Sequence, residues 1–284
     1  MPELPEIEVL RETIATRHLG QTVVGIRLRQ IALLKTYDPP LDGLVGHPLT
    51  GARRYGKHIL LEFSEQVVAA HLGIGGRIVP VEPRGAHPGG RALSLTVEWD
   101  DGSNLDVVEL GTKKRSSVHV LRSDSVVTHL AKLGPDALGD ELTIAALHAC
   151  LQAASVQLKG MLTHQHVIAG IGNAYSDEIL WDAYLSPLRL TSSLADDEIE
   201  RLHTSIGSVL RAAIERARGD NYLTVPKGDK RGSFQVHRRD GQPCSRCSEP
   251  IASIHFADRS LQYCPGCQTD GRHYADRRLS RLLK

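Results

Sequence analysis

The sequence predicts an α+β protein of several domains, in which a strand-rich first half is followed by a helical second half and a small cysteine-bearing module. Three observations carry this prediction. Apolar residues recur with a period of two between about residues 21 and 123, they recur at three- and four-residue steps after residue 124, and four cysteines form two close pairs near the C-terminus. A chain of 284 residues has room for two domains and a small appendage.

A first helix is predicted over residues 3 to 18, because its apolar residues follow each other at helical steps and Gly20 follows as a terminator. These apolar residues are Leu4, Ile7, Leu10 and Ile14. The strands that follow alternate apolar and polar residues, most clearly in the runs Val24, Ile26, Leu28 and Leu93, Leu95, Val97, Trp99. Asp-Gly and Pro-Gly breaks separate such runs, which favours a sandwich or a barrel of mainly antiparallel strands.

The second half is predicted to be helical, with segments near residues 124 to 133, 140 to 153, 155 to 166, 172 to 183 and 195 to 217. The last segment carries the clearest apolar stripe, formed by Ile199, Leu202, Ile206, Val209 and Ala213. A stretch rich in Gly and Lys, residues 219 to 233, indicates a linker. We therefore expect domains over residues 1–123, 124–233 and 234–268, and a basic extension over residues 269–284.

Composition indicates an ordinary soluble protein and excludes few functions. Lys and Arg number 34 against 33 Asp and Glu, so the net charge is +1, and a polyanionic partner would have to be bound by local clusters of basic residues. The acidic start MPELPEIEVL differs from a secretory signal, and no apolar stretch has the length of a membrane span. We therefore expect a cytoplasmic protein, in which close cysteine pairs favour a metal over disulfides.

The paired cysteines have the spacing of a zinc ribbon. Two residues separate Cys244 from Cys247 and Cys264 from Cys267, and sixteen residues separate the pairs. Four thiolates close the coordination shell of one Zn²⁺, so the metal is expected to fold the module and to perform no chemistry. The alternative is a coincidental or disulfide-bonded set. The fifth cysteine, Cys150, is expected to be a small buried apolar residue on a helix.

A glycine turn is predicted between two of the helices, in the sequence QHVIAGIGNAYSDEIL. Gly170 and Gly172 let the backbone bend there, and Asn173 is a favourable N-cap for the second helix. A phosphate can approach the exposed amides at such a helix N-terminus. An ordinary helical hairpin would use the same residues, so the pattern by itself leaves phosphate binding and a plain turn open.

The N-terminus carries an unusual set of groups. Removal of Met1 would expose the secondary amine of Pro2, with Glu3 and Glu6 within one helical turn. An amine of this kind is partly neutral near pH 7 and can attack an electrophilic carbon, while a nearby carboxyl group transfers a proton. The alternative is helix capping, because Pro and acidic residues are also common in the first turn of a helix.

Three motifs together resemble the formamidopyrimidine-DNA glycosylase and endonuclease VIII family over nearly the whole chain. They are MPELPEIE at the start, IAGIGNAYSDEIL in the middle and the cysteine pairs that end in QYCPGCQ. The opening PELPE is similar to the formamidopyrimidine branch. The resemblance implies an N-terminal helix on an antiparallel β-sandwich, a helix-two-turn-helix domain and a four-cysteine zinc finger. It also implies a monomer that binds damaged double-stranded DNA in the cytoplasm, associated with the nucleoid.

The resemblance also implies catalytic roles for individual residues. Pro2 resembles the Schiff-base nucleophile, Glu3 the acid/base that protonates the sugar and assists departure of the base, and Glu6 a supporting carboxylate. Lys57 is similar to the lysine that contacts the lesion phosphate and serves β-elimination. Arg259 resembles the zinc-finger arginine that binds phosphate and takes part in δ-elimination. Without the resemblance, Lys57 would be a solvated lysine at the end of a strand.

Further residues resemble contacts to DNA. Asn173 is similar to the phosphate-binding asparagine of the glycine turn, His71 to a phosphate-contacting histidine, and Lys159 to a contact of the helical domain; Lys57 and Arg259 belong to the same set. The alternatives are a hydrogen-bonded core histidine for His71 and an ordinary surface lysine for Lys159.

The chain departs from the family at the residues that fill the space left by an everted nucleotide. Ile74 stands where a Met is expected, and residues 109 to 115 read ELGTKKR where an Arg and a Phe are expected. This suggests lesions other than 8-oxoguanine, abasic sites that already exist, or a wedge formed by Lys113, Lys114 or Arg115.

A basic tail after the last cysteine pair, which contains Arg272, Arg277, Arg278, Arg281 and Lys284, suggests either a further phosphate contact or a solvated or packed terminal helix.

The sequence therefore favours a base-excision-repair glycosylase that also nicks abasic sites. A non-catalytic or lyase-only DNA-damage binder on the same scaffold is the alternative. A zinc-ribbon interaction module would explain the cysteines, but not the proline amine or the glycine turn.

Overall fold

The computed structural model describes residues 2–88, 90–110, 114–219, 234–256 and 260–274. The described residues fall into two compact units, one within Met1–Lys132 and Ala213–Lys227 and the other within Leu133–Ala212 and Gly228–Lys284. No helix within the described ranges combines the length and the apolar character that crossing a bilayer requires.

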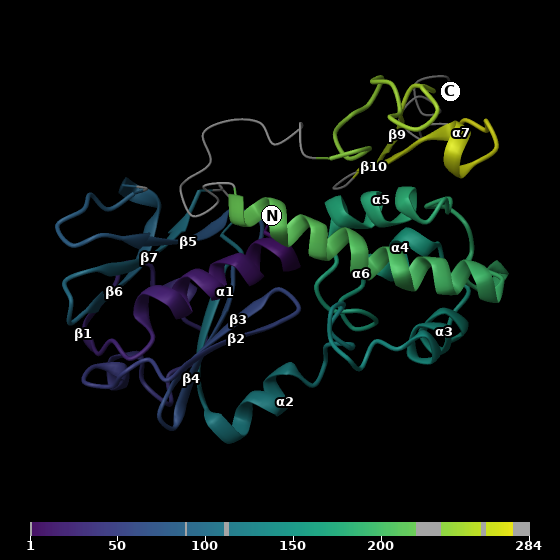
Figure 1. The fold of residues 1–284 in the computed structure, drawn as a ribbon. Helices are drawn as coiled ribbons and strands as arrows, with labels where there is room; N and C mark the ends of the chain where they lie inside the picture. Colours follow the sequence, from purple (N-terminus) through teal and green to yellow (C-terminus); the bar gives the residue numbers. More distant parts are fainter. Residues whose placement is uncertain (1, 89, 111–113, 220–233, 257–259, 275–284) are drawn as a thin grey trace, which may run out of the picture. The chain divides into compact units, whose positions relative to one another are not determined.

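The first unit is a β-sandwich with a helix at its N-terminus (Figure 1). One antiparallel sheet has the order β1 (Val23–Leu28), β6 (Leu93–Trp99), β7 (Asn104–Glu109) and β5 (Gly76–Val81), and the other has the order β2 (Gly51–Tyr55), β3 (His58–Phe63), β4 (Gln66–His71) and β8 (Ser117–Arg122). The helices are α1 (Leu4–His18), α2 (Val126–Leu130) and the last part of α6 (Asp196–Gly219), with short 3-10 turns at Ile31–Leu33, Leu41–Leu44, Gly90–Ala92 and Ser123–Ser125. Of the two predicted arrangements, sandwich and barrel, the sandwich is found.

Apolar side chains from both sheets and from α1 form one core. Helix α1 contributes Ile7, Leu10 and Ile14 to it, all of them buried. The last residue of the helix, His18, stacks on Trp99 with 4.9 Å between the ring centres. Burial of this apolar face along the whole helix holds α1 in place, and with it the N-terminal residues 2 to 6.

In β1, the alternation of buried and exposed side chains differs from the predicted one at Val24. Val24 was expected on the buried face with Ile26 and Leu28, but Val23 is fully buried and Val24 is exposed. The pairing of β1 with β6 shifts register between Val23 and Gly25, as in a β-bulge. Since a bulge inserts one residue into the alternation, the side chains before it change faces.

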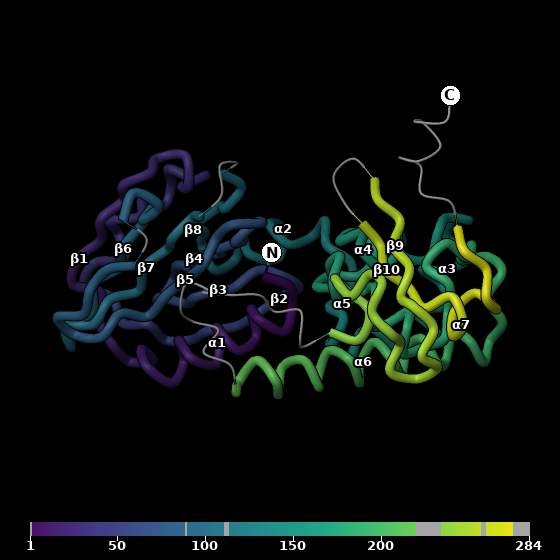
Figure 2. The backbone as a smooth tube through the Cα atoms, turned by 90° about the horizontal axis from the view of Figure 1, so that it is seen from above, coloured from purple at the N-terminus to yellow at the C-terminus, as the bar shows by residue number. Residues whose placement is uncertain are grey.

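The second unit contains the helical segment and the cysteine module (Figure 2). Its helices are α3 (Ile144–Gln152), α4 (Leu158–Thr163), α5 (Asn173–Asp182) and the first part of α6 (Asp196–Gly219), with a 3-10 turn at Thr191–Ser193. The module adds β9 (Ala252–His255), β10 (Ser260–Tyr263) and α7 (Pro265–Gln268). Each predicted helical segment contains a helix, and the predicted fold class is confirmed. Most of the predicted linker, residues 220–233, lies outside the described residues.

Candidate active site and nucleic-acid contacts

The first residues of α1 form a buried cluster of polar groups. Pro2 is buried, and the exposed fractions of Glu3 and Glu6 are 3% and 8%. Glu3 is the N-cap, its carboxylate accepts the N–H of Glu6, and the Glu6 carboxylate accepts the Glu3 N–H at 2.8 Å. This capping box is the helix-capping alternative that was predicted for the acidic residues at the N-terminus. It also holds both carboxyl groups beside Pro2, so capping and a chemical role use the same geometry.

Lys57 lies in the turn between β2 and β3, directly after Gly56, which adopts a φ of +56°. Its side chain is buried, with an exposed fraction of 6%, so the alternative of a solvated lysine is wrong. Burial lowers the pKa of Lys57, and the negative charges of Glu3 and Glu6 oppose this shift. The structure therefore brings Lys57 into electrostatic interaction with both carboxyl groups of the N-terminal cluster.

Replacing Lys57 with Met is expected to stabilise the folded protein near neutral pH. The depressed pKa means that the charged lysine disfavours folding at every pH below its folded-state pKa, and that this cost disappears as the pH rises to the unfolded value of about 10.4. Urea unfolding at pH 7 and at a pH near 10 tests this. The Met variant should be more stable at pH 7, with a smaller gain at the higher pH; a destabilised variant at pH 7 would contradict the buried-charge interpretation.

Arg54 on β2 positions the turn that carries Lys57, a role that the sequence did not indicate. The Arg54 side chain is almost fully buried, its Nε donates to Glu8 of α1 at 2.8 Å, and another guanidinium nitrogen donates to the carbonyl of Gly56 at 3.1 Å. Helix α1 and the turn before Lys57 are thus joined through one guanidinium. A sequence signal existed in the RRYGK run, but only the fold shows which of the two arginines points inward.

His71 ends β4, and its half-buried ring lies 4.9 Å from the ring of His58. Burial lowers the pKa of His71, and the charge of Lys57 lowers it further, so the neutral ring is favoured. The Nδ1 atom accepts the N–H of Gly73 at 3.4 Å. In the neutral ring this places the proton on Nε2, which could donate to a phosphate oxygen. His71 is therefore a partly buried donor near Lys57, a geometry that fits the predicted contact.

Two apolar side chains are exposed on loops of the first unit, one between β4 and β5 and the other after β7. Ile74 has an exposed fraction of 54% and Leu110 one of 45%. The Leu110 N–H donates to the carbonyl of Gly75 at 3.1 Å, so the two loops run next to each other. Of the predicted wedge residues, Lys114 and Arg115 are described and Lys113 lies outside the described residues.

Gly73 fixes the contact between these loops, and replacing it with Ala is expected to destabilise the protein by about 3 kcal/mol. Its φ is +53°, and an added Cβ would lie 2.8 Å from the backbone of Arg115. Gly20→Ala is the matched control, because Gly20 has a φ of +84° and open space around it; there we expect only the backbone cost of about 1 kcal/mol. Equal losses in urea unfolding would contradict the predicted clash.

The glycine turn of the second unit forms as predicted, except for its cap. Gly170 adopts a φ of +112° and Asn173 is the first residue of α5. The N-cap is Gly172 and not Asn173, and no side chain caps this helix end. The N-cap prediction for Asn173 was wrong, because the extended backbone that precedes the helix ends one residue earlier. Asn173 is half-buried at the N-terminus of α5, where its amide can meet an anion.

Lys159 on α4 lies inside this unit, so the alternative of an ordinary surface lysine is wrong. Its ammonium pairs with the buried carboxylate of Asp177 and donates to the carbonyl of Asn173 at 3.0 Å. Both partners belong to the first turns of α5. Lys159 is therefore placed to hold the backbone at Asn173, and a direct contact with DNA stays a prediction.

The four paired cysteines converge in the C-terminal module. Their Sγ atoms all lie within 4.8 Å of one another, and the Cys247 sulfur is 3.3 Å from that of Cys264 and 3.5 Å from that of Cys267. Tetrahedral zinc with Zn–S bonds of about 2.3 Å places sulfur atoms about 3.8 Å apart. The four sulfurs therefore fit one Zn²⁺ with no position left for water.

Cys150, the fifth cysteine, is half-buried on α3. Burial raises the pKa of its thiol, which keeps the thiol protonated and unreactive.

Part of the predicted basic surface lies outside the described residues. This applies to Arg259, which follows β9 and precedes β10 in the sequence, and to Arg277, Arg278, Arg281 and Lys284 of the tail. Of the predicted tail residues, Arg272 is described, and it is exposed.

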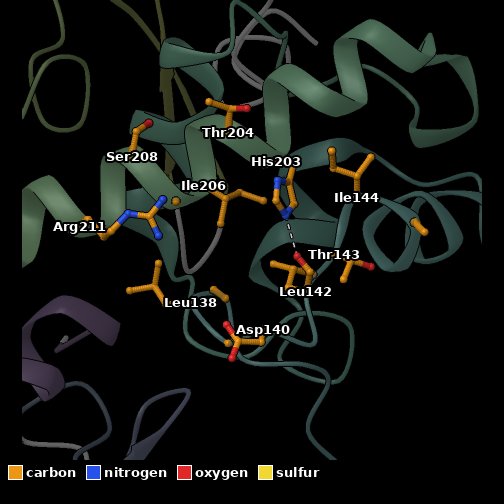
Figure 3. Close-up of a pocket in the computed structure, with 14 residues that line it drawn as sticks. Leu138, Asp140, Leu142, Thr143, Ile144, His203, Thr204, Ile206, Ser208 and Arg211 are labelled. Carbon is orange, nitrogen blue, oxygen red and sulfur yellow. Dashed lines mark hydrogen bonds between the residues drawn. The ribbon is translucent and has the colours of Figure 1, made fainter.

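The second unit also has a surface hollow of about 740 Å³, drawn in Figure 3. It lies between residues 137–145 and α6, where the His203 ring contacts the carbonyl of Leu142 at 2.6 Å. None of the predicted catalytic, DNA-binding or metal residues that the structure describes lines it.

Family models match three parts of the chain. The formamidopyrimidine-DNA glycosylase N-terminal domain matches residues 1–138, the formamidopyrimidine-DNA glycosylase H2TH domain matches residues 133–223, and a zinc finger found in FPG and IleRS matches residues 241–269. The last match and the cysteine geometry together confirm the predicted structural Zn²⁺.

Similar proteins agree with these matches. The chain is 33% identical to the formamidopyrimidine-DNA glycosylase of Symbiobacterium thermophilum, over 94% of this chain and 89% of that protein, and 34% identical to that of Heliobacterium modesticaldum, over 94% and 100%. It is 45% identical to an uncharacterized formamidopyrimidine-DNA glycosylase-like protein of Mycobacterium tuberculosis, over 54% of this chain and 94% of that protein.

Solved structures show the same architecture. A mutant of the Lactococcus lactis FPG protein in complex with DNA that contains Fapy-dG superposes with a TM-score of 0.84 at 26% identity, over 94% of this chain and all of that one. MutM in complex with DNA that contains carbocyclic 8-oxo-G gives the same values. The predicted resemblance is confirmed, and the chain belongs to the formamidopyrimidine-DNA glycosylase family.

Proposed function

We propose that this chain is a base-excision-repair DNA glycosylase with abasic-site lyase activity, in which the amine of Pro2 is the nucleophile. The observation that supports this most directly is that Pro2, Glu3 and Glu6 are buried at the start of α1, and that the charges of Glu3 and Glu6 act on the buried Lys57. Helix capping accounts for the contact between Glu3 and Glu6 but not for a buried lysine that interacts with them, since buried charges generally disfavour folding. The relatives that are named glycosylases and the solved complexes with damaged DNA support the same activity.

The glycosylase step requires a free amine and a proton donor. Once Met1 is removed and the damaged nucleotide has left the base stack, the Pro2 nitrogen attacks C1′ of its sugar. The C1′–N bond to the base breaks, and the base leaves with the bonding electrons. The Glu3 carboxylate takes the proton that the attacking amine loses and passes it to the ring oxygen of the sugar, and the ring opens. The product is an iminium ion that links Pro2 to C1′, with Glu6 holding the backbone of Glu3 in place.

The lyase step uses the acidity that the iminium confers on C2′. A base removes a C2′ proton, the C3′–O bond breaks, and the 3′ phosphate leaves with the bonding electrons. Lys57 suits this role, because burial lowers its pKa and makes a neutral amine more accessible than on an exposed lysine. We propose that His71 and Asn173 contact the flanking phosphates, that Lys159 assists from inside the helical unit, and that Arg259 serves δ-elimination.

Borohydride trapping tests this proposal. Purified, Met1-processed protein is incubated with a duplex that contains one abasic site, and borohydride reduces the iminium to a stable covalent adduct. Wild-type protein should form the adduct, and Pro2→Gly, which lacks the secondary amine, should not. If the wild-type protein binds the duplex without forming an adduct, the lyase proposal fails.

A second candidate function is a lyase-only or non-catalytic damage binder. It is favoured by Ile74 and by residues 109–115, which lack the expected Met, Arg and Phe. A panel of damaged bases decides between the two: a glycosylase releases at least one base, whereas a lyase-only protein nicks the abasic duplex and leaves every intact nucleotide in place.

We propose that the exposed side chains of Ile74 and Leu110 help to fill the space that the everted nucleotide leaves in the duplex. Such a filling would favour lesions that unstack easily.

The finer assignments follow from the same proposal. We infer a monomer that acts on damaged double-stranded DNA in the cytoplasm, associated with the nucleoid. We also propose functional domains at residues 1–123, 124–233 and 234–268, with residues 269–284 as a basic extension.

Truncation after Gln268 should make the DNA affinity less dependent on salt concentration. An unchanged slope of affinity against salt concentration would contradict a phosphate-contacting tail.

A further inference from the structure

A buried carboxylate joins three parts of the second unit. Asp177 on α5 has an exposed fraction of 0%; one of its oxygens accepts a hydrogen bond from Lys159 of α4, and the other lies 2.8 Å from Nδ1 of His237. Lys159 also donates to the carbonyl of Asn173. Since His237 lies in the segment that leads into the zinc module, one network connects the first turn of α5, helix α4 and the entry to that module.

The next residue on α5, Glu178, holds the backbone of the same segment. Its carboxylate accepts the successive N–H groups of Gln235, Val236 and His237 at 2.7, 2.9 and 2.8 Å. Burial raises the pKa of Glu178, and these three hydrogen bonds oppose that rise. Because the backbone of His237 is held by Glu178, its imidazole is oriented toward Asp177.

Arg246 attaches the module near the other end of α5. Its guanidinium carbon lies 3.5 Å from the ring centre of Trp181 and 4.3 Å from that of Tyr184. The guanidinium also donates to the carbonyl of Trp181 at 2.6 Å and to Asp182 at 3.0 Å. Arg246 stands between the first two zinc ligands, so the zinc site itself is joined to the helix.

We propose that Asp177 and His237 are positioning residues that align the zinc module with the glycine turn at Asn173, so that both can contact one DNA backbone at the same time. The inference rests on the proposed function. Parts that are already aligned lose less freedom on binding, so the alignment strengthens the DNA complex. The network does not include Pro2, Glu3 or Lys57, so its loss should weaken DNA binding and leave the chemical step unchanged.

The test compares two substitutions of His237 in the full-length, zinc-loaded protein. His237→Leu removes the group that contacts Asp177, whereas His237→Asn keeps a side-chain N–H near the position of Nδ1. His203→Leu is the matched control, because His203 contacts a carbonyl in the same unit but lies outside the network. We would measure KM and kcat for nicking of an abasic-site duplex, and the zinc content of each variant.

We expect His237→Leu to raise KM about tenfold, as the loss of one hydrogen bond to a charged group predicts. Its kcat and its one zinc per chain should be unchanged, and His237→Asn should restore most of the KM. An unchanged KM, a lower kcat at constant KM, or an Asn variant as defective as the Leu variant would overturn the proposal. Loss of zinc from His237→Leu would also overturn it, because His237 would then fold the module instead of aligning it.

The two proposals fail in different ways. If the wild-type protein forms no borohydride adduct and nicks no abasic site, the proposed function is wrong. If the wild-type protein nicks and only the predicted effects of His237 are missing, the positioning role alone is wrong.

Discussion

Glu3→Gln is expected to slow base excision by a factor of about 10² to 10⁴, the range that a positioned general acid or base contributes. The amide cannot donate the proton that opens the sugar. Its carbonyl oxygen can still accept the N–H of Glu6, so the helix cap is retained and the stability should change by less than about 1 kcal/mol. Single-turnover release of a damaged base, with urea unfolding alongside, measures both effects.

Glu12→Gln is the matched control for this prediction. Glu12 lies on the same helix, about two and a half turns later, and pairs with Arg218 near the surface. Its substitution should leave the excision rate within about twofold of wild type, as is usual for a surface change. If Glu3→Gln excised the base as fast as the control, Glu3 would be a helix cap without a chemical role.

Removal of zinc is expected to unfold the C-terminal module and to abolish tight DNA binding. The buried apolar clusters of the module are small, with Trp181, Val236 and Ile251 around the cysteines and Ile254, Leu261 and Tyr263 on β9 and β10, so we expect the metal to supply much of the folding free energy. Structural zinc contributes about 10 to 16 kcal/mol in small domains. Zinc binds the deprotonated thiolates, so protons compete with the metal for the four sulfurs and acidification should favour its release.

Trp181 provides the readout, because it packs against the module while the other tryptophan, Trp99, lies in the β-sandwich. A chelator should change the tryptophan emission and release one zinc per chain. Cys264→Ala should behave like the chelated protein, and Cys150→Ser should behave like wild type. Zinc-free protein with unchanged emission and unchanged DNA affinity would contradict a structural role for the metal.

Local patterns were sufficient for much of the architecture. The helix over residues 4–18, the alternating strands, the helical segments and the cysteine spacing all depend on residues a few positions apart, whose periodicity is visible in the sequence. The exceptions are small shifts. Val24 lies on the exposed face because the register shifts between Val23 and Gly25. The cap moved from Asn173 to Gly172 because backbone conformation, and not side-chain preference, decided where α5 begins.

The environment of the charged residues was not predictable in the same way. Arg53 and Arg54 are neighbours in the sequence, yet Arg54 is buried against Glu8 while Arg53 is exposed. Lys57 and Lys159 both have the appearance of surface residues, and both are buried. Burial depends on partners that are distant in the chain, since a charge is tolerated inside a protein only where an opposite charge or donor meets it.

The sequence by itself therefore determined the fold class, the zinc ligands and the identity of the family, because each depends on local spacing and on residue type. Only the tertiary structure decided which groups interact: Lys57 with Glu3 and Glu6, and Asp177 with both Lys159 and His237. The physical reason is that pKa values and positioning arise from desolvation and from contacts a few ångströms long. The fold makes these contacts between residues that are distant in the chain, such as Asp177 and His237, which are 60 positions apart.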